Sequence, residues 1–273
     1  MPPPELPEVE TTRRGIEPHV TGRRIESLTI HEHRLRWPVA RHIAAAVAGQ
    51  TIHAVERRAK YLLLRLDRGT LMLHLGMSGN LRVLAHDTPR IAHDHVDLRL
   101  AGGKVLRFND PRRFGSLKLI EGAIEDEPLL KDLAPEPLEP GFDGDYLFRV
   151  TRRRRVAIKL LIMNGRLVTG VGNIYASEAL FRARIRPKRA AKGLTRAECA
   201  ALAAAIRAVL QMAIRAGGTT LRDYVGVDGT PGHFRTRLYV YERAGEPCRR
   251  CGTPIRHLTQ GQRSTYYCPT CQK

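Results

Sequence analysis

The spacing of apolar residues changes along the chain and predicts a helix followed by a sheet. Residues 5–19 (ELPEVETTRRGIEPH) predict a helix with its acidic residues near the positive N-terminal end. Residues 58–66 (RAKYLLLRL) and 70–75 (TLMLHL) then flank the turn Asp67-Arg68-Gly69, which is a hairpin signal. Further short strands with close turns follow, so residues 20–122 predict an antiparallel sandwich or barrel.

The second half of the chain predicts helices. Prolines and glycines between residues 127 and 145 break both periods, and we place a domain boundary there. Thr195-x-x-Glu198 is a capping box, and apolar residues then recur at helical spacing until Gly217-Gly218. Cys199 lies on this apolar face and is interpreted as an inert core thiol. Residues 219–234 are rich in Gly and Thr and predict a long loop, a common form of functional lid.

The charge balance adds a partner to this outline. Lys and Arg number 46 against 27 Asp and Glu, a net charge of +19, so the chain attracts a polyanion. Nucleic acid is the first interpretation, because neutralising phosphates releases counterions. An anionic membrane is the competitor, but we identify no apolar run near the ~20 residues needed to span a bilayer and no signal peptide. We therefore predict a cytoplasmic protein that faces nucleic acid and not a membrane.

Four of the five cysteines form a metal-ligand pattern at the end of the chain. Cys248-x2-Cys251 and Cys268-x2-Cys271 are two knuckles with the ligand spacing that tetrahedral zinc prefers. The alternative, two disulfides, is disfavoured in the cytoplasm. Zinc here is structural, because four protein ligands leave no position for water. Between the knuckles, residues 259–263 predict a hairpin tip that presents Arg263, although a solvated surface arginine explains that residue equally well.

A second basic motif lies upstream of the finger. The segment VAIKLLIM is apolar at helical spacing, and Gly170-Val171-Gly172-Asn173 leads into another helix. Small residues before a helix let backbone amides approach a phosphate, with Asn173 as the cap. A plain tight turn between packed helices is the alternative. The arginines at 152–155, which include Arg154, together with Lys159 favour the phosphate interpretation.

Two further stretches are weaker evidence of function when each is taken alone. The turn Asp110–Gly115 (DPRRFG) exposes two guanidiniums beside the ring of Phe114, which could enter a base stack or simply belong to the core. Met77 and Lys60 need no function beyond a surface methionine and a basic strand edge.

The N-terminal stretch MPPPELPEVE offers covalent chemistry. An α-amino group has a pKa of ~8, so part of it is neutral near pH 7. The amine of an N-terminal proline is secondary and forms an iminium directly when it attacks a sugar C1′, with Glu5 placed to supply acid catalysis. The alternative is that proline and glutamates only favour a helix start.

Taken together, these strings resemble one family. PELPEVE from Pro4, RRAKYL, HLGMSG, HDHVDL, DPRRFG, GVGNIYASEALF and the two CxxC knuckles resemble formamidopyrimidine-DNA glycosylase (Fpg/MutM), a bacterial base-excision repair family. The resemblance implies an α+β fold: an N-terminal β-sandwich with flanking helices, then a helical helix-two-turn-helix domain ending in a β-hairpin zinc finger. The domains it implies are residues 1–133, a linker at 134–149, a helical DNA-binding domain at 150–236 and a zinc finger at 237–273.

The resemblance also implies the activity. Members of this family extrude an oxidised purine from duplex DNA, 8-oxoguanine or a formamidopyrimidine, cut its glycosidic bond and cleave the abasic site by β,δ-elimination; extrusion is what chemistry on a duplex base requires. The partner is double-stranded DNA, the cofactor one structural Zn²⁺ with no small-molecule cofactor, and the default state a monomer. Endonuclease VIII, the pyrimidine-preferring relative, has glycine where Leu6 stands, so we favour the purine branch.

Roles follow position by position from the matching strings. Pro4 would be the Schiff-base nucleophile, Glu5 the acid that assists sugar-ring opening, and Glu8 a supporting residue of the same site. Lys60 and Arg263 would serve the elimination steps. Met77, Arg112 and Phe114 would fill the vacated stack, with Arg112 facing the orphan cytosine. Residues expected to contact DNA are His93, Arg154, Lys159 and Asn173, and residues 219–234 would close over the flipped base.

One departure from the family pattern concerns the first residues. PELPE directly follows the initiator methionine in the family, whereas Pro2 and Pro3 intervene here. A proline inside a chain has no amine lone pair for attack, so Pro4 can act only if the active chain begins there. If only Met1 is removed, Pro2 carries the amine, which is then displaced by up to ~7 Å from the position it would have at Pro4. The extra prolines keep open a non-catalytic lesion binder. A general zinc-finger regulator would leave the N-terminal carboxylates unexplained.

Overall fold

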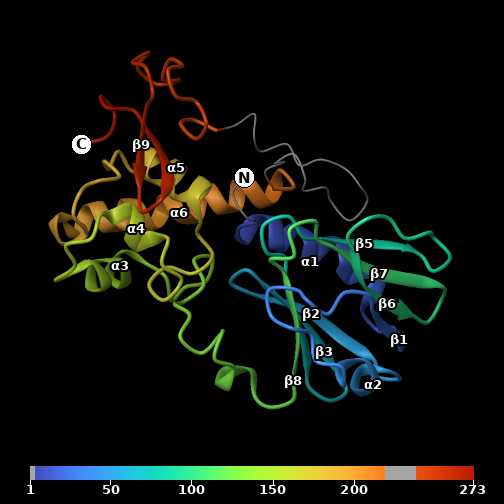
Figure 1. Ribbon diagram of the computed structural model, residues 1–273. Coiled ribbons are helices and arrows are strands. Elements are labelled where there is room, and N and C mark those ends of the chain that lie inside the picture. The colour runs from blue at the N-terminus through green and yellow to red at the C-terminus, as the bar shows by residue number, and fades with distance from the viewer. Residues whose placement is uncertain (1–3, 219–237) are drawn as a thin grey trace. The chain divides into compact units, whose positions relative to one another are not determined.

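The chain folds into two compact units, which are described separately. The computed structural model describes residues 4–218 and 238–273. The N-terminal unit is built mainly from residues 4–131, and the C-terminal unit from residues 132–215 and 238–273 (Figure 1).

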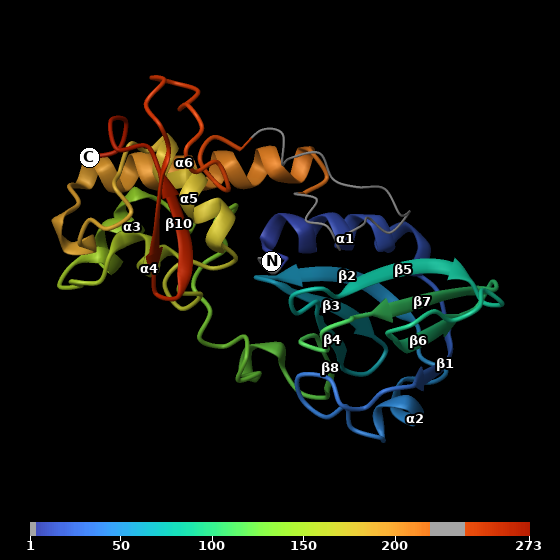
Figure 2. The ribbon, with the colours of Figure 1, turned by 45° about the horizontal axis from the view of Figure 1, so that its top comes forward.

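Two four-stranded antiparallel sheets make up the described part of the N-terminal unit. One sheet has the strand order β1-β6-β7-β5 and the other β2-β3-β4-β8. The strands are β1 (Ile25–Ile30), β2 (Ile52–Arg58), β3 (Tyr61–Leu66), β4 (Thr70–His74), β5 (Asn80–Ala85), β6 (Asp94–Leu100), β7 (Lys104–Asn109) and β8 (Ser116–Ile120). Helix α1 (Leu6–Val20) packs against β2, β3 and β5, and the short α2 (Ile43–Val47) packs against β1 (Figure 2). A 3-10 turn, η1 (Ile124–Asp126), follows the last strand.

One hydrophobic core joins the two sheets and α1. It includes Ile16 of α1, Leu64 of β3, Leu98 of β6 and Phe108 of β7, each at most 3% exposed. Burying a side chain of this size stabilises the fold by ~1.5–3 kcal/mol. The two sheets packed on this shared core form the sandwich that the sequence predicts.

The β2–β3 hairpin is tighter than the sequence predicts. The apolar run suggested a strand from Arg58, but Arg58 ends β2, Ala59 and Lys60 form a two-residue turn, and β3 begins at Tyr61. Ala59 has a φ of +55°, a conformation that costs a non-glycine residue energy and clusters at functional sites. The strand prediction was wrong by these residues because periodicity does not record a reversal without glycine.

Helices dominate the C-terminal unit. They are α3 (Gly144–Thr151), α4 (Ile158–Ile162), α5 (Asn173–Arg182) and α6 (Arg196–Arg215), with a 3-10 turn η2 (Ala191–Gly193) before α6. Helix α3 begins inside the stretch predicted as a linker. The capping box is present, because Glu198 N–H donates to Thr195 Oγ1 at 3.2 Å and Thr195 N–H to Glu198 Oε2 at 2.8 Å. Helix α6 packs against both α3 and α5.

Helix α6 is also the longest apolar stretch in the described chain. Its length and composition would allow it to cross a membrane, so the prediction that no apolar run approaches that length was wrong, but half of this stretch is buried inside the unit. Cys199 lies on the buried face, and burial raises the pKa of its thiol, as expected for an unreactive core cysteine. Core helices pass the same length test, so α6 is weak evidence for a membrane.

The unit ends in a β-hairpin. Strands β9 (Arg256–Gln260) and β10 (Arg263–Tyr267) pair in antiparallel register, and β10 packs against α5. The turn residues Gly261 and Gln262 have φ of +55° and +58°, the tight reversal that a two-residue hairpin needs.

Candidate active site and nucleic-acid interface

The first turn of α1 buries two carboxylates beside Pro4. Pro4 is buried, and Glu5 and Glu8 are 0% and 2% exposed. Glu5 is the N-cap residue, and its backbone N–H donates to Glu8 Oε2 at 2.9 Å. Glu8 therefore fixes the backbone next to Pro4, and the fully buried Glu5 directly follows Pro4 in the chain. Pro2 lies outside the described residues.

A salt-bridge cluster ties α1 to the hairpin that carries Lys60. Glu10 accepts hydrogen bonds from Arg13, Arg14 and Arg57, the last at 3.1 Å. Burial would raise the pKa of Glu10, but the hydrogen bonds from Arg13 and Arg14 and the surrounding positive charge lower it below its ordinary value. Arg57 Nη1 also donates to the Ala59 carbonyl at 2.9 Å, directly before Lys60. Sequence analysis included Arg57 only in the string RRAKYL and missed this role.

Lys60 lies near a neutral histidine. The Lys60 side chain is half-buried in its turn. Burial, followed by the charges of Lys60 and Arg36, lowers the pKa of His74 to about 4. His74 Nδ1 accepts the Gly76 N–H at 3.0 Å, which fits the neutral ring. His74 was absent from the predicted site, because a lone histidine before a turn gives no sequence signal of its surroundings.

The three residues predicted to fill a base stack lie on two neighbouring loops. Met77 is half-buried, Arg112 is exposed, and Phe114 is 43% exposed although phenylalanine is usually buried. The Arg112 guanidinium lies over the Phe114 ring, 5.0 Å from its centroid. His93, which is predicted to contact DNA, is exposed and has a φ of +70°. The centroid of its ring lies 6.3 Å from that of His95.

In the C-terminal unit, Lys159 is fully buried rather than exposed. Its ammonium donates to Asn173 Oδ1 at 2.6 Å, Thr265 Oγ1 at 2.7 Å and the Ser264 carbonyl at 3.0 Å. Asn173 Nδ2 donates to the same carbonyl at 3.0 Å. These bonds fix the peptide next to Arg263, so the two residues hold the hairpin on the helices.

The predicted cap at Asn173 was wrong. Gly172 is the N-cap of α5, and Asn173 is its first helical residue. The Asn173 amide is instead used by Lys159 and the hairpin, as described above. Arg154, by contrast, is exposed, as a phosphate-contacting side chain must be.

The hairpin presents Arg263 at its tip. Arg263 is exposed and opens β10, directly after the turn. The tip packs on α4, because a Cβ on Gly261 would lie 2.7 Å from Leu160 Cδ2. The φ of +55° at Gly261 also favours glycine, so the turn residue suits both the reversal and the close contact with Leu160.

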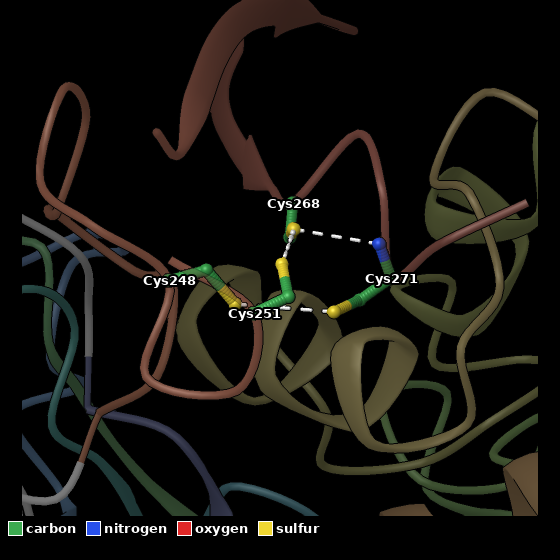
Figure 3. Close-up of side chains that lie close together, drawn as sticks. All are labelled: Cys248, Cys251, Cys268 and Cys271. Carbon is green, nitrogen blue, oxygen red and sulfur yellow. Dashed lines mark hydrogen bonds between the residues drawn. The ribbon is translucent and has the colours of Figure 1, made fainter. Parts of the chain in front are cut away.

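The four predicted cysteines converge into one cluster (Figure 3). Their Sγ atoms all lie within 4.8 Å of one another, with Cys248–Cys271 at 3.9 Å and Cys251–Cys268 at 3.5 Å. Tetrahedral Zn–S bonds of ~2.3 Å place sulfurs ~3.8 Å apart, so the cluster fits one zinc ion. Backbone amides of Arg250 and Cys271 point at Cys248 and Cys268 Sγ at 3.4 Å, as thiolate ligands require. The chain binds one structural Zn²⁺.

A buried glutamine connects the zinc cluster to the chain just after α5. Gln272 is 0% exposed; its Oε1 accepts the Cys268 N–H, and its Nε2 donates to the Ile185 carbonyl, both at 2.9 Å. Neighbouring-shell hydrogen bonds of this kind orient metal ligands. Sequence analysis missed this role, since a glutamine beside the last cysteine is typical of a surface position. The predicted lesion-closing loop at residues 219–234 lies outside the described residues.

The sandwich, the helical unit and the four-cysteine hairpin together define a helix-two-turn-helix protein with a structural zinc finger. Three family models match the chain in order: the formamidopyrimidine-DNA glycosylase N-terminal domain at residues 3–117, the formamidopyrimidine-DNA glycosylase H2TH domain at 133–225, and the zinc finger found in FPG and IleRS at 245–273. The chain belongs to the formamidopyrimidine-DNA glycosylase family.

Named relatives agree over the whole length. The formamidopyrimidine-DNA glycosylase of Thioalkalivibrio sulfidiphilus is 61% identical over 270 residues, 99% of this chain and 100% of the relative. The crystal structure of the MutM (Fpg) protein from Thermus thermophilus is 44% identical with a TM-score of 0.88, covering 98% of each chain. A complex of Lactococcus lactis Fpg (MutM) with Fapy-dG-containing DNA is 34% identical with a TM-score of 0.90, covering 98% of this chain and 100% of that one.

Proposed function

We propose that this protein is a DNA glycosylase that removes oxidised purines from duplex DNA and then cleaves the abasic site. The observation that carries the proposal is the first turn of α1, where the buried Glu5 directly follows Pro4 and its backbone N–H is held by the buried Glu8. The relatives named formamidopyrimidine-DNA glycosylase, and the Fpg structure bound to Fapy-dG-containing DNA, support the substrate class.

The chemistry begins with the amine of Pro4. Its lone pair attacks C1′ of the damaged nucleotide, the bond from C1′ to the base nitrogen breaks, and the base leaves with a proton. Glu5 donates a proton toward the sugar ring oxygen, so the ring opens and the nitrogen becomes an iminium. The iminium acidifies the C2′ hydrogen, which permits loss of the 3′ phosphate and then of the 5′ phosphate. Lys60 and Arg263 serve these elimination steps.

Substrate binding uses both units. Met77, Arg112 and Phe114 fill the space that the extruded nucleotide leaves, with Arg112 facing the orphan base. Exposed His93 and Arg154 contact phosphates. Lys159 and Asn173 serve the interface through the hairpin that they hold, because the Lys159 ammonium is buried among three acceptors.

The remaining features complete the proposal. The protein acts in the cytoplasm as a monomer and without a small-molecule cofactor, since the covalent step uses only the proline amine and side chains. Zinc holds the hairpin that carries Arg263 and takes no part in bond cleavage, because its four thiolates leave no position open.

A second candidate is a lesion binder that does not cut. It is favoured by Pro2 and Pro3, which stand ahead of Pro4 in the sequence. A nucleophile displaced by up to ~7 Å lies far outside the ångström tolerance of covalent catalysis. The catalytic proposal therefore requires that the active chain begin at Pro4.

One experiment tests both candidates. Natively expressed protein is weighed intact and trapped with borohydride on a duplex containing 8-oxoguanine. We expect a covalent adduct from chains that begin at Pro4. A fully active, trappable chain that still carries Pro2 and Pro3 would overturn the assignment of Pro4, and tight binding without any nicking would favour the lesion binder.

Glu5→Gln supplies a side-chain test with a matched control. We expect excision of 8-oxoguanine to fall ~100-fold or more, because general acid catalysis contributes at least that factor. Glu17→Gln, at the far end of the same helix and 43% exposed in its side chain, keeps excision near wild type. Equal activity of the two variants would remove Glu5 from the mechanism.

A further inference from the structure

Two loops of the sandwich carry the residues proposed to enter the DNA. The loop between β4 and β5 (residues 75–79) carries Met77, and the loop between β7 and β8 (residues 110–115) carries Arg112 and Phe114. Met77 is separated from the other two by more than thirty residues of sequence. Their relative placement therefore depends on whatever joins the loops.

A single buried carboxylate makes that connection. Asp110 is 0% exposed, and its Oδ1 accepts the Ser78 hydroxyl of the other loop at 2.6 Å. Its Oδ2 accepts the Gly115 N–H at 2.8 Å, which closes the 110–115 loop. The Arg112 N–H is shared between Asp110 Oδ1 at 3.3 Å and Ser78 Oγ at 3.2 Å. Ser78, which follows Met77, and Gly115, which follows Phe114, therefore both bond to the Asp110 carboxylate. The Arg112 N–H bonds to Asp110 and to Ser78.

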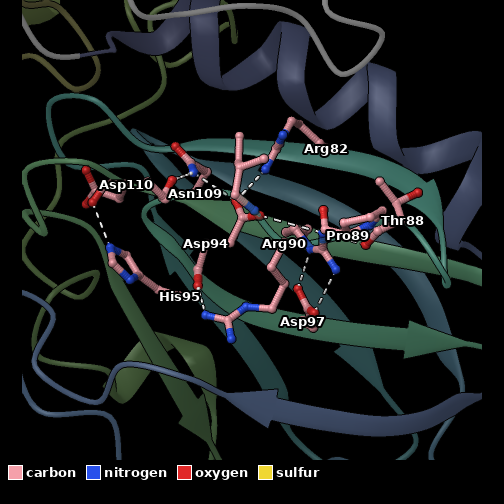
Figure 4. Close-up of polar contacts among 12 residues, drawn as sticks. Arg82, Thr88, Pro89, Arg90, Asp94, His95, Asp97, Asn109 and Asp110 are labelled. Carbon is pink, nitrogen blue, oxygen red and sulfur yellow. Dashed lines mark hydrogen bonds and ion pairs between the residues drawn. The ribbon is translucent and has the colours of Figure 1, made fainter.

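The backbone of Asp110 is anchored as well. Its carbonyl accepts His95 Nε2 at 2.8 Å, the contact drawn at the left of Figure 4, and also the Arg113 N–H at 3.2 Å. Its own N–H donates to the His93 carbonyl at 3.0 Å. Asp110 is therefore held against the start of β6 and has no freedom to follow either loop.

The two loops also touch backbone to backbone. A Cβ on Gly76 would lie 2.4 Å from both Phe114 C and Gly115 N, and Gly76 has a φ of +67°. A Cβ on Gly115 would lie 2.5 Å from the Phe108 ring and 3.1 Å from Asp110 Oδ2. With no space between them, the loops move together or not at all.

We propose that Asp110 is a positioning residue for damage recognition. It fixes Met77, Arg112 and Phe114 relative to one another before DNA binds, so that opposite-base discrimination depends on a side chain that touches no DNA. The proposal rests on the proposed function, and it extends that function to a residue for which the sequence analysis assigned no role.

The physical reason is preorganisation. Burying a carboxylate is costly unless donors surround it, and here the hydroxyl and two amides serve both oxygens. The entropic cost of ordering the two loops is then met when the protein folds rather than when it binds DNA. Asparagine has the same shape but only one acceptor oxygen. Its NH₂ group must therefore face either the Gly115 N–H or the Ser78 hydroxyl and Arg112 N–H, and one set of bonds is lost.

The test compares Asp110→Asn with Asp97→Asn in single-turnover assays. Asp97 is a matched buried carboxylate on β6, bonded to Arg107 at 2.7 and 2.9 Å and 5% exposed, but it lies outside both loops (Figure 4). The duplexes carry 8-oxoguanine opposite cytosine, 8-oxoguanine opposite adenine, or a preformed abasic site. Equilibrium unfolding of each variant is measured alongside.

We expect D110N to lower the preference for cytosine over adenine ~10-fold, the value of one good base contact. Cleavage of the abasic duplex, where no base is extruded, changes far less. D97N is destabilised but keeps the cytosine preference. Ser78→Ala, which removes only the bond between loops, shifts the preference in the same direction by a smaller factor and serves if D110N does not fold.

The outcomes separate the two proposals. A wild-type protein that cleaves neither lesion nor abasic duplex would overturn the proposed function. An active wild type whose D110N and S78A variants keep the full cytosine preference would overturn the positioning role alone. So would a D97N variant that loses the preference as strongly as D110N, because the effect would then follow stability rather than loop placement.

Discussion

The loops of the sandwich and the zinc-finger hairpin both present exposed arginines, but they are held in different ways. The loops that carry Met77, Arg112 and Phe114 lie on a core shared by two sheets and are joined by Asp110. The hairpin that carries Arg263 has a small apolar cluster around Phe181 and Ile255. It relies on four thiolates and on the buried ammonium of Lys159.

This difference determines how each region responds to the loss of a hydrogen bond or of the metal. A loop seated on a large core loses precision when one hydrogen bond is removed, because the strands below it remain folded. A hairpin with little apolar surface loses its structure when its metal is removed, because the metal supplies the energy that a core would otherwise provide. Three measurements probe this contrast.

Metal removal has the largest expected effect. Cys268→Ser, or a strong chelator, should unfold the hairpin and abolish cleavage of lesion DNA, since structural zinc contributes an apparent ~10–16 kcal/mol. Hydrogen exchange at β9–β10 and strand cleavage report the loss. Fluorescence of Trp37, the one tryptophan in the sequence, reports the sandwich and should keep its unfolding midpoint.

The control for metal removal is the fifth cysteine. Cys199 lies on the buried face of α6, outside the cluster, so the Cys199→Ala variant should retain one zinc per chain. If metal removal also abolished the unfolding transition of the sandwich seen by Trp37 fluorescence, the sandwich would depend on the finger. The proposed contrast between the two regions would then be wrong.

Removing the buried ammonium should have an intermediate effect. Lys159→Met leaves three acceptors without their shared donor and should destabilise the hairpin by about 2–3 kcal/mol. Hydrogen exchange at Ser264 and Thr265 is then faster while zinc stays bound. Lys192→Met, an exposed lysine of the same unit, is the matched control. Unchanged exchange in Lys159→Met would mean that zinc alone holds the hairpin.

Acid should produce the smallest of the three effects, and in the sandwich. The pKa of His74 is lowered to about 4 from an ordinary 6.5, so below pH 6.5 the unfolded chain takes up a proton that the folded chain refuses. Stability is therefore fully present above pH 6.5 and is lost as pH falls toward 4, by about 2 kcal/mol at about pH 5.

Denaturant unfolding followed by Trp37 fluorescence at about pH 7, 6 and 5 measures this loss across the window between the two pKa values. His74→Gln should flatten the decline, whereas His42→Gln, an exposed histidine of the same unit, should leave it unchanged. An equally steep decline in His74→Gln would assign the acid sensitivity to other groups.

Much of the architecture was predictable because it depends on local patterns. Apolar runs on both sides of turn residues predicted the paired strands, a capping box predicted the start of α6, and the spacing of four cysteines predicted the zinc cluster, all of which the structure confirms. The start of β3 and the cap at Asn173 were wrong. In the first case a reversal without glycine at Ala59 left no mark in the periodicity, and in the second the contact with Lys159 uses the Asn173 side chain.

The candidate site divides in the same way. Glu5 was selected because a carboxylate beside a proline amine can supply acid catalysis, and the resemblance supplied the roles proposed for Pro4, Glu8, Lys60 and Arg263. Asp110, Arg57 and Gln272 were missed. Each acts by hydrogen bonds to residues outside its own local motif, and a sequence pattern does not contain such partners.

What the sequence determined alone was the order of elements, the zinc ligands, the basic charge and the family. Those properties depend on residue type and on spacing within a few turns or strands. Only the tertiary structure decided that Lys159 is buried beneath the hairpin, that His74 is neutral beside Lys60, and that Asp110 joins two loops. Burial and charge at a residue depend on everything packed around it, and that surrounding exists only once the chain has folded.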